Sequence, residues 1–274
     1  MKLGTMVTLN MEHLEAELIT LREMGFETCQ LCCWQEDLLT AQNARTARRL
    51  LEKHGVQVSA FWCGWPGPCE WNFTYGPVTI GLVPAAYRAR RLETLQKGSD
   101  FSAELGVEDI ATHMGFIPVN PQDADYAGFL GAVRTLARHC ARNSQYLLFE
   151  TGQEPPVTLL RTIEDTGTGN LGINLDPANL LMYGLGNPID ALDVFGGYVR
   201  NVHGKDGVSP HNGRELGEEK AIGSGKVNYP EFIRKLKALG YDRYITIERE
   251  ISGEEQKRDI LAAKRYLEEL WAAE

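Results

Sequence analysis

A strand, a helix and a second strand can be read in residues 146–179, whose sequence is YLLFETGQEPPVTLLRTIEDTGTGNLGINLDPAN. An apolar run of strand length begins the stretch, the pair Pro155-Pro156 can open a helix, and a second apolar run ends it. Strands that alternate with amphipathic helices predict a parallel sheet covered by helices. This unit therefore favours an α/β fold.

The same alternation continues over the rest of the chain. Helical spacing puts Leu14, Leu18 and Leu21 on one face of a segment, and Gly55 and Gly106 follow helical runs where a terminating glycine belongs. Eight apolar runs are candidate strands, at residues 2–9, 28–34, 57–64, 109–115, 146–152, 171–179, 198–206 and 244–250. Eight repeats predict a (β/α)₈ TIM barrel, a parallel eight-stranded barrel with outer helices, built as one domain from residues 1–274. An open doubly wound sheet is the alternative, although its usual Gly-rich nucleotide motif is missing.

Composition and charge narrow the class of protein. Hydrophobic residues make up 43% and charged residues 24% of the 274 residues, as in globular proteins. The formal net charge of −9 disfavours a surface that follows nucleic-acid phosphates. We expect no nucleic-acid partner and no membrane partner, and a cytoplasmic location, because neither a signal peptide nor a long apolar span is present. A homo-oligomer is left open.

The six cysteines are expected to be reduced thiols. Cys29, Cys32 and Cys33 lie inside an apolar run, which favours burial in the core over a disulfide framework. Cys29 and Cys32 match the spacing of a redox or zinc motif only weakly, and a metal clip would need a second ligand pair, which Cys63 and Cys69 could supply. This is the weaker interpretation.

The last four predicted strands share a feature at their carboxyl ends. Each apolar run is followed by a residue type that binds metals: Glu150, Asp176, His203 and Glu248. A single carboxylate in such a place often caps the next helix, but four in succession indicate a common site, because parallel strands end at the same face of a barrel. Two long connections, at about residues 65–84 and 207–228, are expected at that face as well.

If these four side chains converge, they bring three negative charges into a partly enclosed space. Such a cluster is costly without a cation, because the carboxylates repel one another or take up protons. Three oxygen ligands and one nitrogen ligand suit Mn²⁺, Mg²⁺ or Co²⁺, and Zn²⁺ is also compatible. The residues alone do not choose between these ions.

Several of these motifs resemble a known family. The segments are FETG at 149–152, NLDPAN at 174–179, VHGKD at 202–206 and GSGKVNY at 223–229. Together they are similar to the xylose isomerase-like TIM-barrel superfamily, in the group of sugar phosphate isomerases and epimerases that includes tagatose 3-epimerase. The resemblance covers the whole chain in architecture and is most specific from Tyr146 to Glu250.

The resemblance implies one divalent metal ion, with Mn²⁺ expected first, held by Glu150, Asp176, His203 and Glu248. In enzymes of the tagatose 3-epimerase type, the metal chelates the ketose carbonyl and a neighbouring hydroxyl. The chemistry also fits the residues, because a cation that stabilises an enediolate makes the neighbouring proton removable by a carboxylate. We expect an isomerase or epimerase of a small ketose or keto-sugar, with Glu150 and Glu248 as the catalytic acid and base.

Other residues near these strand ends are candidates for contacts with the carbohydrate substrate. They are Trp62, His113, Glu154, Asn179, Lys205 and Arg214. Asp206 is expected to orient His203 or Lys205. Asn179 departs from the family pattern, because tagatose 3-epimerases and the related DNA-repair endonucleases have histidine there. This difference disfavours DNA repair and a tagatose-like specificity.

Two other functions remain compatible with the sequence. A lyase on the same scaffold, such as an inosose dehydratase, a dehydroshikimate dehydratase or a C-glycoside deglycosidase, would begin with the same proton abstraction. A barrel that only binds a metal or a sugar is disfavoured because both glutamates are present. The residues do not decide whether the substrate carries a phosphate.

Overall fold

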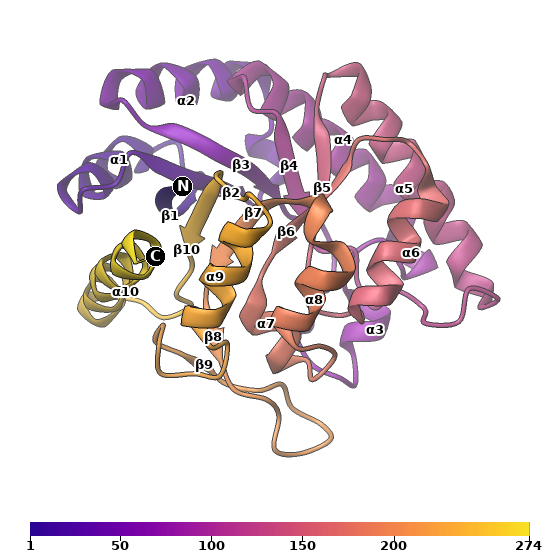
Figure 1. The fold of residues 1–274 in the computed structure, drawn as a ribbon. Helices are drawn as coiled ribbons and strands as arrows, with labels where there is room; N and C mark the ends of the chain where they lie inside the picture. Colours follow the sequence, from indigo (N-terminus) through magenta and orange to yellow (C-terminus); the bar gives the residue numbers. More distant parts are fainter. Residues whose placement is uncertain (274) are drawn as a thin grey trace.

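The strands of the protein close into a parallel barrel. The computed structural model describes residues 1–273. Strand β1 pairs with β2 on one side and with β10 on the other, which closes the ring (Figure 1). The barrel strands are β1 (Lys2–Thr8), β2 (Thr28–Cys33), β3 (Gln57–Cys63), β4 (Asp109–Thr112), β5 (Tyr146–Glu150), β6 (Leu171–Leu175), β7 (Val199–Gly204) and β10 (Tyr244–Ile247). The predicted (β/α)₈ barrel is confirmed, and the open sheet is excluded.

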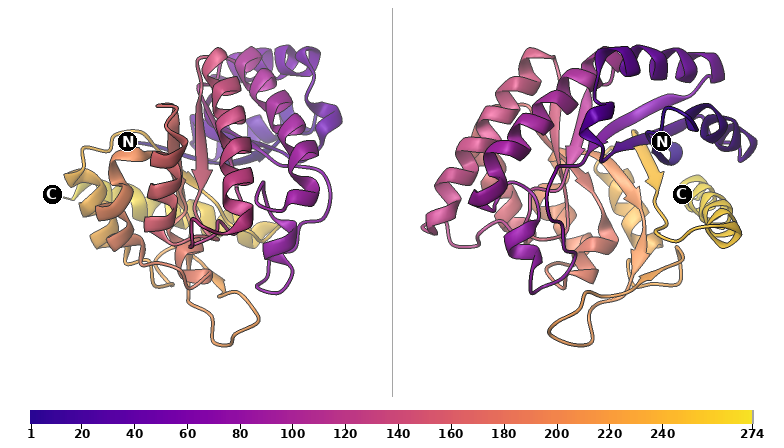
Figure 2. Two further views of the ribbon diagram at one scale, coloured as in Figure 1. Left: turned by 90° about the vertical axis from the view of Figure 1, so that its right-hand side faces the viewer. Right: turned by 180° about the vertical axis from the view of Figure 1, so that it is seen from behind.

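Helices cover the outside of the barrel, as the two views in Figure 2 show. They are α1 (Leu14–Glu23), α2 (Ala41–His54), α3 (Gly76–Thr79), α4 (Ala85–Leu105), α5 (Ala124–Arg142), α6 (Pro156–Thr166), α7 (Pro177–Met182), α8 (Pro188–Phe195), α9 (Tyr229–Ala238) and α10 (Glu254–Ala272), with short 3₁₀ turns at Glu36–Leu38 and Gly196–Tyr198. Local chemistry sets several helix ends. The Thr40 side chain accepts a hydrogen bond from the Asn43 N–H at the start of α2, and Gly55 ends that helix in a left-handed conformation with φ of 63°.

The hydrophobic core lies between the barrel and the helices. All residues of β2 are buried, as expected for a parallel strand that is covered on both faces. Leu14, Leu18 and Leu21 form the buried face of α1, which confirms their predicted helical spacing. Phe61 of β3 packs against Phe101 of α4 with ring centroids 5.1 Å apart.

The interior of the barrel is unusually polar. Gln30 of β2 and Asn174 of β6 are fully buried and hydrogen-bonded to each other across the barrel. One layer further from the site, the Asn201 amide donates to the Ser59 hydroxyl, which also contacts the hydroxyl of Thr246. Branched apolar side chains usually fill this space in TIM barrels. Buried amides and hydroxyls need partners, so their presence indicates that the interior supports a polar site.

Several predicted strands extended too far at their carboxyl ends. The run 171–179 was expected to be one strand, but β6 ends at Leu175 and α7 begins at Pro177. Asp176 is the capping residue between them, since its Oδ1 accepts a hydrogen bond from the Asn179 N–H. Proline at the first helical position suits this early start. Glu248 likewise lies just beyond β10 instead of within it.

The two long connections project from the same end of the barrel, at the lower edge of Figure 1. The connection after β3 contains α3, and the connection after β7 contains a small antiparallel ribbon of β8 (Asp206–Gly207) and β9 (Glu219–Lys220). This ribbon was not expected from the sequence. The position of both connections at the carboxyl ends of the strands agrees with the prediction.

A buried arginine fixes the first of these connections. Arg91 of α4 is inaccessible to solvent and donates hydrogen bonds to the backbone carbonyls of Pro66, Pro68 and Gly81. Its guanidinium also lies over the ring of Trp65, at 5.5 Å from the centroid. Burial lowers the pKa of Arg91 to about 10, so the group keeps its charge at neutral pH. The loop therefore closes around a charged side chain of the neighbouring helix.

Two further expectations concern the thiols and the membrane. All six cysteines are free, and all are buried except the half-buried Cys69. Within residues 1–273, no helix combines the length and the apolar character that crossing a membrane requires.

Candidate metal centre

The four side chains that follow the last barrel strands meet at one point. Glu150, Asp176, His203 and Glu248 each offer a ligand atom, and these atoms all lie within 4.8 Å of one another. They lie at the carboxyl ends of β5, β6, β7 and β10, which are neighbours in the barrel. The predicted convergence is therefore present in the structure. A buried cluster of three carboxylates and one imidazole could bind a divalent metal ion.

Two buried atoms in the cluster have no hydrogen-bond partner. They are Oδ2 of Asp176 and Nδ1 of His203, both in residues with no solvent exposure. The nearest oxygens of Glu248 and Glu150 lie 3.1 and 3.2 Å from Nδ1, but neither is aligned for a hydrogen bond. An unpartnered buried polar atom is costly, and two that face the same space fit a cation placed between them. The residues present thus fit a metal ion.

The electrostatics of the cluster support the same conclusion. Burial alone would lower the pKa of His203, but the charges of Glu150 and Glu248 raise it well above its ordinary value. In the absence of a metal ion, the carboxylates therefore draw a proton onto the imidazole. A divalent cation would take the place of that proton, because a metal binds the neutral ring.

The other nitrogen of His203 is fixed by residues that the sequence analysis missed. Nε2 lies 2.8 Å from Oε1 of Gln30, and the Gln30 amide donates to Oδ1 of Asn174 at 3.1 Å. The Asn174 amide nitrogen also lies 3.0 Å from Nε2. With a metal ion on Nδ1, the neutral ring would carry its proton on Nε2, where Gln30 Oε1 is the acceptor within reach. A polar residue in the middle of the apolar run TCQLCC was the available signal for Gln30.

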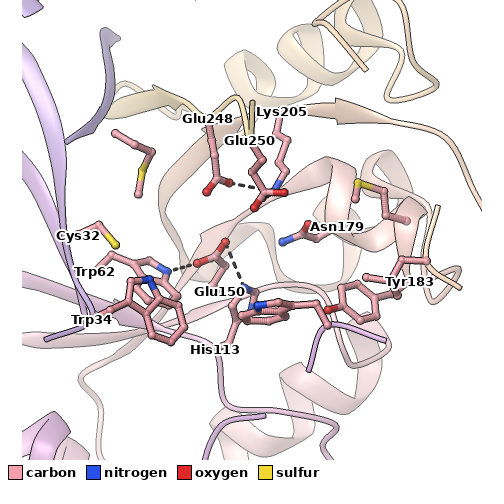
Figure 3. Close-up of a pocket in the computed structure, with 14 residues that line it drawn as sticks. Cys32, Trp34, Trp62, His113, Glu150, Asn179, Tyr183, Lys205, Glu248 and Glu250 are labelled. Atoms are coloured by element: carbon pink, nitrogen blue, oxygen red, sulfur yellow. Dashed lines mark hydrogen bonds and ion pairs between the residues drawn. The ribbon is translucent and has the colours of Figure 1, made fainter. Parts of the chain in front are cut away.

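Glu150 lies at the centre of the site, as Figure 3 shows. The Trp62 indole N–H donates to its Oε2, and His113 Nε2 lies 3.5 Å from its Oε1. Burial raises the pKa of Glu150, but the charges of His113 and His203 outweigh this effect and hold the pKa below its usual value. The structure thus places Trp62 and His113 in direct contact with a predicted ligand.

A buried lysine connects the centre to the rim of the site. Lys205 Nζ lies 3.2 Å from Glu248 Oε2, 3.6 Å from Asp176 Oδ2 and 3.0 Å from Glu250 Oε1. Burial would lower the pKa of Lys205, but the carboxylates of Glu248, Asp176 and Glu250 raise it well above its ordinary value. Burial likewise raises the pKa of Glu248, and Lys205 and His203 together lower it below its usual range. The role of Glu250 as a partner was not foreseen, although Glu250 follows Glu248 by two residues and would share its face in an extended segment.

Asp206 does not make the predicted contact with His203 or Lys205. Its carboxylate instead accepts hydrogen bonds from the backbone N–H groups of Gly207, Gly223, Gly225 and Val227, at 2.8 to 3.1 Å. A Cβ on Gly225 would lie 2.1 Å from the carboxylate, so only glycine permits this approach. Asp206 therefore fixes the turn before α9. The expected orienting contact is absent because three of the four donors come from residues 17 to 21 positions further along the chain, which no local pattern reveals.

A cavity of about 410 Å³ opens above the centre, which is the size of a small-molecule site. Trp62, His113, Asn179 and Lys205 line it, as do Glu150 and Glu248. Other lining residues are Met6, Cys32, Trp34, Trp71, Met182, Tyr183, Leu216 and Glu250.

Two predicted substrate contacts lie elsewhere. Arg214 is exposed on the loop between β8 and β9 and is absent from the cavity wall. Glu154 is buried and does not line the cavity. Burial raises its pKa well above the ordinary value, although hydrogen bonds from the backbone of Gly152 and Gln153 oppose this. Neither residue lines the cavity in this structure, because a polar residue near a strand end can turn outward or into the core.

Comparison with known proteins identifies the family. The model of the family described as xylose isomerase-like TIM barrel matches residues 18–270. A xylose isomerase domain protein from Planctomyces limnophilus has a crystal structure with a TM-score of 0.91 and 32% sequence identity, which covers 98% of this chain and 96% of that chain.

More distant structures share the fold. A 3-keto-D-glucoside 4-epimerase from E. coli is 17% identical, with a TM-score of 0.73 and coverage of 98% of this chain and 99% of that chain. A probable 3-DHS dehydratase from Bacillus anthracis is also 17% identical, with a TM-score of 0.70 and coverage of 97% and 98%. The family match spans most of the sequence and agrees with the closed barrel, so the chain belongs to the xylose isomerase-like TIM barrel family.

Proposed function

We propose that the protein is a divalent-metal-dependent isomerase or epimerase of a small ketose or keto-sugar. The observation that carries this proposal is the pair of unpartnered buried atoms, Asp176 Oδ2 and His203 Nδ1, which face Glu150 and Glu248 in one cavity. These four residues would hold the ion. Three oxygen ligands and one nitrogen ligand favour Mn²⁺ first, with Mg²⁺, Co²⁺ and Zn²⁺ as alternatives.

The proposed chemistry is the removal of a proton next to a carbonyl group. A bound divalent cation supplies Lewis acidity, which stabilises the negative charge that develops on the carbonyl oxygen. The pKa values of Glu150 and Glu248 are held below their usual values, so both side chains are ionised and able to accept a proton. Strands β6 and β7 separate β5 from β10, so the two glutamates approach the cavity from different sides.

Two carboxyl groups on different sides of a substrate can change its stereochemistry. One takes the proton from the carbon, and the other, once protonated, returns a proton to the opposite face. His113 and Lys205 line the same cavity and carry N–H groups that can donate to substrate oxygens, and the Asn179 amide can do the same. Trp62 supports this arrangement by fixing one oxygen of Glu150 through its indole N–H.

Proton exchange with solvent tests the proposal directly. Mn²⁺-loaded protein is incubated in D₂O with ketoses, keto-inositols and keto-glycosides, and deuterium incorporation is followed by NMR. Glu150→Gln and Glu248→Gln should each slow exchange by about 10²–10⁴-fold, the usual contribution of a general acid or base. Glu254→Gln is the matched control, because that glutamate is exposed at the start of α10. A loss of less than about tenfold in both active-site variants would contradict the assigned roles.

A lyase is the second candidate function, and one contact in the cavity supports it. His113 Nε2 lies 3.5 Å from Glu150 Oε1 at the cavity wall, where it could protonate a departing hydroxyl or sugar oxygen. The same NMR experiment separates the two reactions. A product of unchanged mass indicates an isomerase or epimerase, whereas loss of water or of an aglycone indicates a lyase.

A further inference from the structure

The cavity above the candidate metal centre has two chemically different sides. Glu150, Glu248, Glu250 and Lys205 form the polar side, while Trp34 and Trp62 lie together on the other side, as Figure 3 shows. The Trp62 indole N–H is occupied by Glu150. Trp34 has no hydrogen bond to the metal cluster, and the same holds for Trp71, which also lines the cavity. The proposed proton transfer therefore leaves these two indoles without a role.

Trp34 is held firmly in place. Its ring centroid lies 4.9 Å from that of Trp62 and 5.3 Å from that of Trp65, both of which are buried. Its indole also rests directly on the backbone of Gly64, where an added Cβ would lie 2.4 Å from a ring carbon. Trp34 nevertheless remains 42% exposed. A packed ring with an open face is a preformed platform for a ligand.

Trp71 forms a corner with this platform. Its ring stands nearly perpendicular to that of Trp34, at 85°, with centroids 6.5 Å apart, and lies 5.1 Å from the ring of His113. It is 40% exposed. Two large apolar rings that both face a cavity leave a contiguous apolar surface in water, which commonly marks a binding site. The corner adjoins His113 and thus the reacting side of the cavity.

The charges around this corner favour a neutral ligand. Lys205 is the only Lys or Arg side chain among the cavity-lining residues of the described chain, and it is already within 3.6 Å of three carboxylates. Glu250, which lies at the rim and has a side-chain exposure of 56%, would repel an anion. A phosphate group normally requires arginine, lysine or a helix N-terminus. The cavity wall offers none of these in a free state within residues 1–273.

We propose that Trp34 and Trp71 form a second subsite for the neutral, ring-shaped aglycone of a glycoside whose keto-sugar ring lies at the metal centre. This inference rests on the proposed function and names its substrate class. The C–H face of a pyranose and the face of an aryl ring both stack on indole, so either aglycone satisfies the same chemistry. A free ketose or a sugar phosphate would leave the two rings uncovered.

The first test compares substrates that differ only in the aglycone. Proton exchange is measured in D₂O with Mn²⁺-loaded protein on the methyl, p-nitrophenyl and glucosyl glycosides of a 3-keto-glucoside, and on fructose and fructose 6-phosphate. We expect KM for both ring-bearing glycosides to lie about tenfold below that of the methyl glycoside, the size of one aromatic stacking contact. The p-nitrophenyl and glucosyl arms show whether an aryl or a sugar ring is preferred. A KM for fructose 6-phosphate that is equal to or lower than the KM for the ring-bearing glycosides overturns the proposal.

The second test removes the rings. In Trp34→Ala and Trp71→Ala, the preference for the ring-bearing over the methyl glycoside should fall about tenfold, and Trp34→Phe and Trp71→Phe should restore most of it. Tyr75→Ala is the matched control, because Tyr75 is an exposed aromatic residue of the connection that contains Trp71 and does not line the cavity. An unchanged preference in both alanine variants, with melting temperatures like that of the wild type, overturns the proposal.

A binding measurement separates this inference from the proposed function. Titration calorimetry of Glu150→Gln with the p-nitrophenyl and methyl glucosides needs no catalysis. The subsite stands if the p-nitrophenyl glucoside binds more tightly than the methyl glucoside and if adding Trp34→Ala removes that difference. This holds even when no substrate exchanges a proton. If exchange occurs with fructose but the two glucosides bind equally, the proposed function stands and the subsite is wrong.

Discussion

The orientation of a single histidine decides whether the candidate centre can bind a metal. Gln30 Oε1 lies 2.8 Å from His203 Nε2, so Gln30→Leu removes the acceptor at that nitrogen and frees the ring to turn. We expect metal affinity to fall about 10–100-fold, as for other residues that orient a ligand. Calorimetric titration of metal-free protein with Mn²⁺ measures this, and Gln30→Glu, which keeps the acceptor, should recover most of the affinity.

The control for Gln30 is another buried glutamine. Gln145 accepts from the Ser99 hydroxyl and donates to the Val107 carbonyl, and it precedes β5, at the opposite end from the centre. Gln145→Leu should destabilise the fold by about 1–3 kcal/mol and leave the metal affinity unchanged. A similar loss of affinity in both variants would mean that Gln30 acts only through general stability.

Glu154 gives a prediction about pH. Its folded-state pKa is raised by burial above the unfolded value, so its contribution to stability is fully present below about pH 4.3 and is lost as pH rises toward the folded pKa. Glu154→Gln removes this titration. The variant should therefore gain stability relative to the wild type between about pH 5 and about pH 8, as measured by urea unfolding. A stability difference that is constant over this range would show that Glu154 does not titrate there.

At the scale of elements, the connection after β3 depends on one side chain of α4. Arg91→Met removes the donors for the carbonyls of Pro66, Pro68 and Gly81, so we expect a loss of about 2–4 kcal/mol and faster proteolysis between β3 and α4. Arg90→Met is the matched control, because Arg90 precedes Arg91 in α4 but is exposed and pairs with Glu36 at the surface. Equal proteolysis of the two variants would show that Arg91 does not hold the connection.

The carboxyl ends of the barrel strands show what the sequence alone could predict. Apolar runs that end in Glu150, Asp176, His203 or Glu248 are short-range patterns, and closure of a parallel barrel necessarily brings their ends to one face. The barrel and the four candidate ligands were therefore predictable.

Contacts between distant segments were not predictable in the same way. Gln30 acts from the opposite side of the barrel, 173 residues away from His203, and Trp34 owes its position to Gly64. The position of Arg214 away from the cavity wall has the same origin, since the path of the β8–β9 loop depends on contacts that no local pattern reveals. Only the packed structure shows which polar side chains of a loop turn toward the cavity.

At the scale of the whole molecule, a metal ion at this centre would join the second half of the barrel. Its four ligands come from β5, β6, β7 and β10, and β10 also pairs with β1 to close the ring. In the unfolded chain these ligands are spread from Glu150 to Glu248, so the ion should bind the folded state almost alone. Metal binding should therefore stabilise the entire barrel.

The size of this effect follows from mass action. A metal concentration about 100 times Kd adds about 2.7 kcal/mol, and for a chain of this size each kcal/mol raises the melting temperature by about 2–4 °C. Protein treated with EDTA should thus melt roughly 5–10 °C below protein in excess Mn²⁺. Asp176→Asn keeps the cap on α7, because asparagine also accepts from the Asn179 N–H, but it removes one charged ligand. The variant should keep its fold and lose most of the rise in melting temperature that Mn²⁺ causes. An equal rise in the wild type and in Asp176→Asn would mean that the metal binds elsewhere.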